Sequence, residues 1–197
     1  KKYPKIIRTI DNLQEVHNLY LDCNSIIYDA VYSIKENKGI ITNTIINKVC
    51  EKLEFYISSI KPTSHVFIAF DGVAPVAKLE QQRTRRYRSK LISQINESLD
   101  KDKFKLDFDS TCITPGTIFM HNLSKNIKSK FKDPNKFNVD KITVSCSDEH
   151  GEGEHKLFEY IRNNINYHKD KNTVIYGLDA DLIMLSINHL PISKNIY

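Results

Sequence analysis

Several patterns that identify common classes of protein are missing from this 197-residue sequence. The four cysteines form no CxxC pair, and the seven histidines show neither HxxxH nor HExxH spacing, which argues against a zinc site and against a disulfide framework. Cys23, Cys50 and Cys146 lie inside apolar segments. We therefore expect free thiols in a reducing compartment, the cytoplasm, with the nucleus as the open alternative.

Long hydrophobic runs are also missing. No apolar stretch approaches the roughly 20 residues that a membrane-spanning helix needs, and the first residues lack the pattern of a signal peptide. No internal repeat or low-complexity segment is present. We expect no membrane partner, and because the chain starts at Lys1 rather than Met, we expect its natural amino terminus to lie further upstream.

An excess of one charge is present but small. The sequence has 29 Lys and Arg against 24 Asp and Glu, a formal net charge of +5, which alone gives only a hint of an anionic partner. The distribution is more informative, since six cations fall between Lys78 and Lys90. The ordinary interpretation of such a run is a solvated helix face, and an anion-binding surface is the alternative.

Short apolar runs that predict strands alternate with stretches that predict helices. The predicted strands are residues 18–22, 66–70, 142–145 and 173–178. The predicted helices are residues 3–16, 24–34, 42–60 capped by Thr42 or Thr44, 77–98, one starting at Thr114-Pro115, 151–166 and one from Leu182 onward, with a surface connection over 128–141. This alternation predicts one α/β domain over residues 1–197, with a mostly parallel sheet flanked by helices.

Acidic side chains stand at the carboxyl end of each predicted strand or just beyond it. They are Asp22, Asp71, Glu152, Glu154, Asp179 and Asp181. Because the carboxyl ends of parallel strands meet at one edge of a sheet, we expect the six carboxylates to gather there. That much negative charge requires cations, and Mg²⁺ and Mn²⁺ prefer carboxylate oxygens. Two such ions roughly 3.5–4 Å apart could hold the attacking water and the leaving oxygen of a phosphodiester.

Each acidic fragment also has an ordinary interpretation. A single Asp at a strand end is more often a helix cap or a turn residue, and acids in the segment GEGEH (151–155) suit the first turn of a helix. Four separate segments nevertheless place acids at the same edge, and this coincidence favours a site. A helix face beside it carries Lys78, Gln82 and Arg85 at helical spacing, with Arg86 at its edge. These side chains can surround a phosphate.

At these residues the sequence resembles the XRN family of 5′→3′ exoribonucleases. The matching segments, in the family's order, are LYLDCNSII, FDGVAPVAKLEQQRTRRYRS, DSTCITPGTIFM, GEGEHKLFEYIR and YGLDADLIML. They run from about residue 18 to residue 186, which is nearly the whole chain. The combination of the second and fourth segments is highly specific for this family.

The resemblance implies a fold of the PIN/flap-nuclease type and a metal-dependent exonuclease that digests single-stranded RNA with a 5′-monophosphate to mononucleotides, as in mRNA decay. It implies that the six acids are catalytic ligands of Mg²⁺ or Mn²⁺. It also implies that a 5′-phosphate pocket is formed by Lys78, Gln82, Arg85 and Arg86. Tyr28 stands where the family usually has a histidine that stacks on the first base, and tyrosine can also stack.

Other positions depart from the family's pattern. Ser25 replaces a usual glycine, and Val76 replaces a usual arginine. The family's downstream region, which normally supplies one more aspartate, is not in this sequence, so we expect the chain to be one piece of a larger protein. Two alternatives remain open: a flap-type structure-specific endonuclease, and an RNA-binding scaffold that has lost catalysis.

Overall fold

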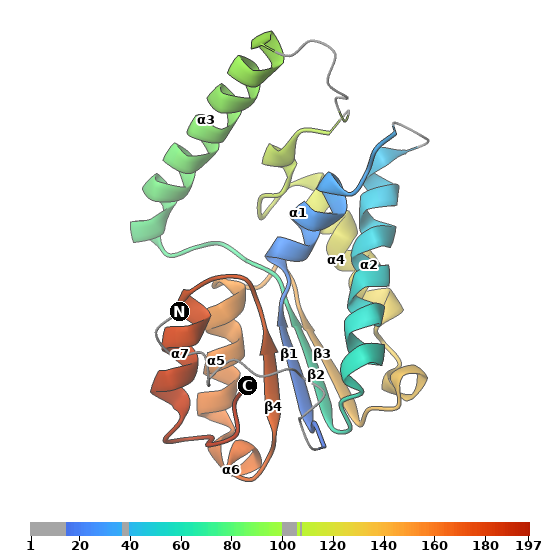
Figure 1. Ribbon diagram of the computed structural model, residues 1–197, viewed down its shortest axis with the longest axis vertical. Helices are drawn as coiled ribbons and strands as arrows, with labels where there is room; N and C mark the ends of the chain where they lie inside the picture. Colours follow the sequence, from blue (N-terminus) through green and yellow to red (C-terminus); the bar gives the residue numbers. More distant parts are fainter. Residues whose placement is uncertain (1–14, 37–39, 100–105, 107) are drawn as a thin grey trace.

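The computed structural model describes residues 15–36, 40–99, 106 and 108–197, and its centre is a sheet of four parallel strands with helices on both faces (Figure 1). The strands are β1 (Asn18–Asp22), β2 (His65–Ala69), β3 (Lys141–Ser145) and β4 (Thr173–Tyr176). Their order across the sheet is β3-β2-β1-β4. The predicted α/β class and parallel sheet are confirmed.

Seven α-helices and two 3₁₀ helices are present in the described part of the chain. The α-helices are α1 (Asn24–Tyr32), α2 (Ile41–Ile60), α3 (Val76–Leu99), α4 (Ile118–Lys130), α5 (Gly153–Asn163), α6 (Ile165–His168) and α7 (Asp181–His189). The 3₁₀ helices are η3 (Ser110–Cys112) and η4 (Pro134–Phe137). None of these helices is long and apolar enough to cross a membrane.

Side chains of the central strands alternate between two apolar cores. In β1, Leu19 and Leu21 join the larger core, which includes buried residues of α1, α2 and α4. Tyr20 points to the other face and joins a smaller core with Leu157 of α5 and Leu182 of α7. Figure 1 shows these two helical layers on either side of the sheet. Because both faces are covered, the central strands β1 and β2 are buried along almost their whole length, whereas the edge strand β3 is only partly buried and alternates polar with apolar residues.

The start of one helix and the cap of another differ clearly from the prediction. The helix predicted from Thr114-Pro115 begins instead at Ile118, where the hydroxyl of Thr117 accepts a hydrogen bond from the Met120 N–H at 3.3 Å. Gly116 has a φ of +88°, which no α-helix can include, so the helix can start only after it. The predicted threonine caps of α2 are also wrong, because its N-cap is Ile40 and no side chain caps it.

Two further predictions need correction or lie outside the described residues. The connection over 128–141 is not only surface, because it contains η4 and buries Phe131 and Val139 in the larger core. The helix predicted over residues 3–16 falls almost wholly outside the described part of the chain. All four cysteines are free thiols, as predicted.

Candidate metal and phosphate site

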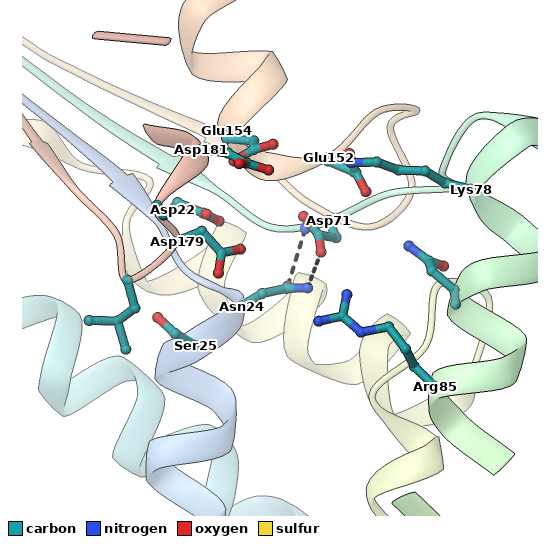
Figure 2. Close-up of a pocket in the computed structure, with 13 residues that line it drawn as sticks. Asp22, Asn24, Ser25, Asp71, Lys78, Arg85, Glu152, Glu154, Asp179 and Asp181 are labelled. Atoms are coloured by element: carbon teal, nitrogen blue, oxygen red, sulfur yellow. Dashed lines mark hydrogen bonds and ion pairs between the residues drawn. The ribbon is translucent and has the colours of Figure 1, made fainter. Parts of the chain in front are cut away.

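A cavity of about 380 Å³ opens at the carboxyl edge of the sheet (Figure 2). The six predicted acids all line it and are called the acidic rim here: Asp22, Asp71, Glu152, Glu154, Asp179 and Asp181. Three polar side chains of α3 line it as well and are called the donor face: Lys78, Gln82 and Arg85. Residues up to 159 positions apart in the sequence, from Asp22 to Asp181, therefore share one cavity.

The sheet topology explains why the acidic rim converges. Asp22 is the last residue of β1, and Asp71 follows the end of β2 by two residues. Glu152 is the N-cap of α5 after β3, and Glu154 lies in the first turn of that helix. Asp179 comes from the connection between β4 and α7. Because the four strands are parallel and lie in the order β3-β2-β1-β4, these segments all leave the same edge of the sheet, and α5 contacts β1 and β2.

Burial and mutual repulsion make the rim unfavourable for negative charge. Burial, and then the neighbouring Asp71, Glu154 and Asp179, raise the pKa of Asp22 to about 7. Burial also raises the pKa of Asp71 and that of Glu154 above their ordinary values. A divalent cation would reverse this penalty, since an opposite charge within a few ångströms stabilises a carboxylate.

Unpaired oxygens in the rim fit such a cation. Among the described residues, Asp22 Oδ1 and Glu154 Oε2 are buried and accept no hydrogen bond. Buried carboxylate oxygens normally have partners, so an ion bound between them would satisfy both. Figure 2 shows Asp22, Asp179, Asp181 and Glu154 close together on one side of the cavity. The donor set consists of oxygen atoms, which suits Mg²⁺ or Mn²⁺.

The donor face meets the rim at an ion pair. Lys78 Nζ lies 2.6 Å from Glu152 Oε2, and this hydrogen bond raises the pKa of Lys78. Figure 2 shows the guanidinium of Arg85 pointing toward the cavity from α3. Positive donors therefore border the acidic rim directly, which is the arrangement that a phosphate next to metal ions requires.

Two residues of the predicted phosphate and base contacts do not line this cavity. Arg86 is exposed on α3, and Tyr28 on α1 is 38% exposed. The charges of Arg86 and Arg85 oppose the effect of burial on the Tyr28 pKa, so both guanidinium groups lie within electrostatic reach of the ring. The stacking role of Tyr28 stays a prediction.

Comparison with known proteins agrees with this geometry. The family model described as "XRN 5'-3' exonuclease N-terminus" matches residues 1–195. The chain belongs to the XRN 5′-3′ exonuclease family. The resemblance given by the sequence motifs is confirmed.

Named relatives of this XRN-family chain come from several eukaryotes. The chain is 37% identical to 5′-3′ exoribonuclease 1 of Saccharomyces cerevisiae over 95% of its own length and 13% of that protein. It is 37% identical to human 5′-3′ exoribonuclease 1, covering 95% of the chain and 12% of that protein. It is 36% identical to 5′-3′ exoribonuclease 2 of Schizosaccharomyces pombe, covering 90% of the chain and 20% of that protein. The chain thus spans about one fifth or less of these relatives.

The structure adds Asn24 to the site of this XRN-family chain. Its side-chain amide donates to Asp71 Oδ2, and its side-chain oxygen accepts from the Asp71 N–H at 3.2 Å. The other Asp71 oxygen, Oδ1, accepts from the Gly153 N–H at 2.7 Å. Both oxygens of Asp71 are therefore held by the protein. Asn24 stands within the LYLDCNSII motif, but nothing in its spacing indicates this partner.

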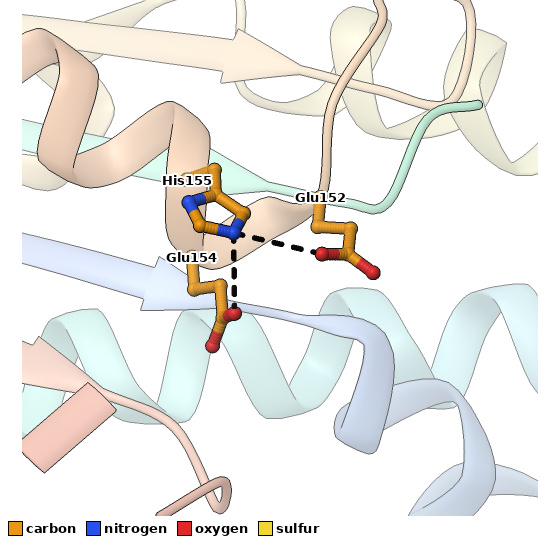
Figure 3. Close-up of side chains that lie close together, drawn as sticks. All are labelled: Glu152, Glu154 and His155. Carbon is orange, nitrogen blue, oxygen red and sulfur yellow. Dashed lines mark ion pairs between the residues drawn. The ribbon is translucent and has the colours of Figure 1, made fainter. Parts of the chain in front are cut away.

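His155 was also not predicted, although it belongs to the GEGEH segment. Its Nε2 lies 3.7 Å from Glu152 Oε2 and 3.7 Å from Glu154 Oε1 (Figure 3). One ligand atom from each of these three side chains lies within 4.8 Å of the others. The imidazole is half exposed, at 51%, and borders the rim from the solvent side.

Lys156 is a buried lysine beneath the rim. Its Nζ donates to the Phe70 carbonyl at 2.8 Å and to the Cys146 carbonyl at 2.9 Å, and burial lowers its pKa. These carbonyls belong to the residues that follow β2 and β3. Gly72, in the loop after β2, lies so close to the loop after β3 that a Cβ on it would be 1.6 Å from the Glu149 carbonyl oxygen. Lys156 and Gly72 together keep the two loops, and hence Asp71, in place.

Proposed function

We propose that this chain is the catalytic part of a metal-dependent 5′→3′ exoribonuclease, which removes mononucleotides from single-stranded RNA with a 5′-monophosphate in cytoplasmic RNA decay. The main support is that one cavity has the acidic rim on one side and the donor face on the other. The names of the relatives support the same reaction class. Since the chain spans only part of those proteins, the activity of the whole protein belongs to the proposal.

The acidic rim would hold two Mg²⁺ or Mn²⁺ ions. When bound, such ions lower the pKa of a water nucleophile and offset the charge that develops on the phosphate. The chain's own contribution is to hold the carboxylates in place before the substrate arrives. Asp71 is fixed by three hydrogen bonds, while Asp22 and Glu154 each keep a buried oxygen free for a cation. Preorganised charge of this kind is a major source of catalysis.

The donor face would bind the leading phosphate of the RNA. Arg85 offers a planar fork of N–H donors, Lys78 offers an ammonium, and Gln82 offers an amide. The ion pair between Lys78 and Glu152, at 2.6 Å, keeps the donor face at a fixed distance from the acidic rim. A fixed distance would place the same linkage, the one after the first nucleotide, at the metal ions in each cycle. Removal of mononucleotides follows from this spacing.

A labelled-RNA assay tests the proposal. The protein at its natural length, with Mn²⁺, should release mononucleotides from RNA with a 5′-phosphate and should leave RNA with a 5′-hydroxyl largely intact. Asp71→Ala or Asp179→Ala should abolish cleavage while RNA binding, measured by fluorescence anisotropy, largely persists. Internal cuts regardless of the 5′ group would indicate a structure-specific endonuclease instead. Binding without digestion by the unmodified protein would indicate a scaffold.

A further inference from the structure

Asn24 uses both polar atoms of its side chain on a single residue. The amide donates to Asp71 Oδ2, and the carbonyl oxygen accepts from the Asp71 backbone N–H at 3.2 Å. Figure 2 shows both bonds as dashed lines between α1 and the segment after β2. The two residues are 47 positions apart, so this contact is tertiary and contributes nothing to a local turn.

The position of Asn24 does not call for an asparagine on other grounds. Asn24 is the first residue of α1, and that helix has Cys23 as its N-cap without any side-chain cap bond. Asparagine is favoured as a cap, not at the next position, so helix formation does not explain it. The side chain lines the cavity, where its polar atoms face the acidic rim. Its one described use is therefore to hold Asp71.

We propose that Asn24 is a positioning residue that orients the Asp71 carboxylate for the cations of the acidic rim. The proposal rests on the function proposed above. The Gly153 N–H holds Oδ1 at 2.7 Å, and Asn24 fixes the rotation of the carboxylate by holding Oδ2. Without Asn24, only the hydrogen bond from the Gly153 N–H to Oδ1 would hold the Asp71 carboxylate, and Oδ2 could rotate away from its position. Hydrogen-bond partners of ligating carboxylates typically change metal affinity or activity about ten- to a hundredfold when they are removed.

The chemistry of the contact separates positioning from simple packing. Asn24→Ala removes both bonds. Asn24→Asp keeps the shape and can still accept from the Asp71 N–H, but it replaces the amide donor by a carboxylate facing a carboxylate. If only the shape of residue 24 mattered, the aspartate variant would behave like the unmodified protein. If the amide donor matters, Asn24→Asp should weaken Mn²⁺ binding at least as much as Asn24→Ala does.

The test measures Mn²⁺ affinity by electron paramagnetic resonance, without RNA, and separately measures kcat and KM with 5′-phosphorylated RNA. We expect Asn24→Ala and Asn24→Asp to weaken Mn²⁺ binding about ten- to a hundredfold. We expect kcat to fall in parallel while KM changes less than about twofold, because the donor face is untouched. The matched control is Asn126→Asp, which adds the same charge at an exposed position of α4 and should leave both quantities unchanged.

The outcomes distinguish this proposal from the proposed function. Mn²⁺ affinity of Asn24→Asp equal to that of the unmodified protein would overturn the positioning role. An unmodified protein that binds Mn²⁺ but digests no RNA would contradict the proposed exoribonuclease function alone. The comparison of Mn²⁺ affinities would still decide the role of Asn24. Thermal melts without metal serve as the folding check, and a properly folded alanine variant with unchanged Mn²⁺ affinity would also overturn the proposal.

Discussion

At the scale of single residues, Gly153 makes room for the acidic rim. A Cβ at this position would lie 2.5 Å from Asp22 Oδ1 and 3.4 Å from the Ala69 carbonyl oxygen. The first distance is well below van der Waals contact, so the Asp22 carboxylate would have to move. Glycine is therefore required here by space, and it also supplies the N–H that binds Asp71.

Gly153→Ala should weaken Mn²⁺ binding by about tenfold or more, because it displaces a proposed ligand, and should destabilise the fold by about 1–3 kcal/mol through overpacking. Isothermal titration with Mn²⁺ and chemical unfolding measure the two effects. Gly116→Ala is the control, since φ at Gly116 is +88° and its Cβ would meet nothing within 4 Å. That variant should lose stability through backbone strain but keep its Mn²⁺ affinity. Unchanged Mn²⁺ affinity in Gly153→Ala would contradict the argument.

The residues of the site differ in how far the sequence could predict them. The six acids were predictable because each follows a strand, and parallel strands bring their ends together. The roles of Asn24 and Lys156 were not predictable, because Asn24 binds Asp71, 47 positions away, and Lys156 joins Phe70, 86 positions away, to Cys146. Such partners depend on side-chain packing in three dimensions, for which residue type and spacing give no signal.

At the scale of elements, α3 contacts the rest of the molecule through its donor face. Within the part of α3 whose burial is described, Lys78 and Gln82 are the only side chains that are not exposed. Figure 1 shows the helix projecting away from the sheet beyond this point. The helix is therefore held at the cavity, where its positive charges face the acidic rim.

Arg85→Ala should reduce the preference for 5′-phosphorylated over 5′-hydroxyl RNA by about ten- to a hundredfold, since a hydrogen bond to a charged group contributes about 1.5–3 kcal/mol. Competition between the two RNAs in one digestion measures this preference. Arg88→Ala removes the same charge from an exposed position of α3 outside the cavity and should change the preference little. Equal effects of the two variants would show that only the general charge of α3 matters.

The elements were predicted more reliably than their ends. The predicted bounds of all four strands agree with the observed bounds to within two residues, because short apolar and β-branched runs are typical of strands in a sheet covered on both faces. The start of α4 was wrong because Thr114-Pro115 is an equally good start signal. The backbone of Gly116, with its φ of +88°, decides between the two starts, and its conformation is set by the fold.

At the scale of the whole molecule, a buried network joins the sheet to the layer of α5 and α6. The Tyr20 hydroxyl lies 2.7 Å from His168 Nε2 and 3.2 Å from His65 Nδ1, and His65 Nε2 lies 2.8 Å from the Thr143 hydroxyl. Burial, together with Lys141 and His168, lowers the pKa of His65 to about 3. His65 is therefore neutral in the folded protein at ordinary pH.

This network predicts a loss of stability in acid. The unfolded chain can protonate His65 below its ordinary pKa of about 6.5, whereas the folded protein resists down to about pH 3. The contribution of His65 is thus fully present above about pH 6.5 and should fall by about 2 kcal/mol by pH 5. Asp22 acts in the opposite direction between pH 7 and its ordinary value of 3.8, because its pKa is raised to about 7.

A variant isolates the histidine from the opposing aspartate. The free energy of unfolding of His65→Gln, relative to the unmodified protein, should rise by about 2 kcal/mol between pH 7.5 and pH 5, since the variant cannot lose this contribution. Urea unfolding at each pH measures it. His121→Gln, on the exposed surface of α4, should follow the unmodified protein throughout. A constant difference between His65→Gln and the unmodified protein would contradict the neutral network.

The proposed reaction requires cations bound at the acidic rim next to a phosphate held by the donor face. The most direct measurement is a crystal structure with Mn²⁺ and a nucleoside 5′-monophosphate, with data collected at the manganese absorption edge. We predict anomalous peaks inside the cavity, in contact with Asp22, Glu154 and Asp179, and the phosphate on Lys78 and Arg85. A cavity without anomalous peaks, or a phosphate bound elsewhere, would contradict the account.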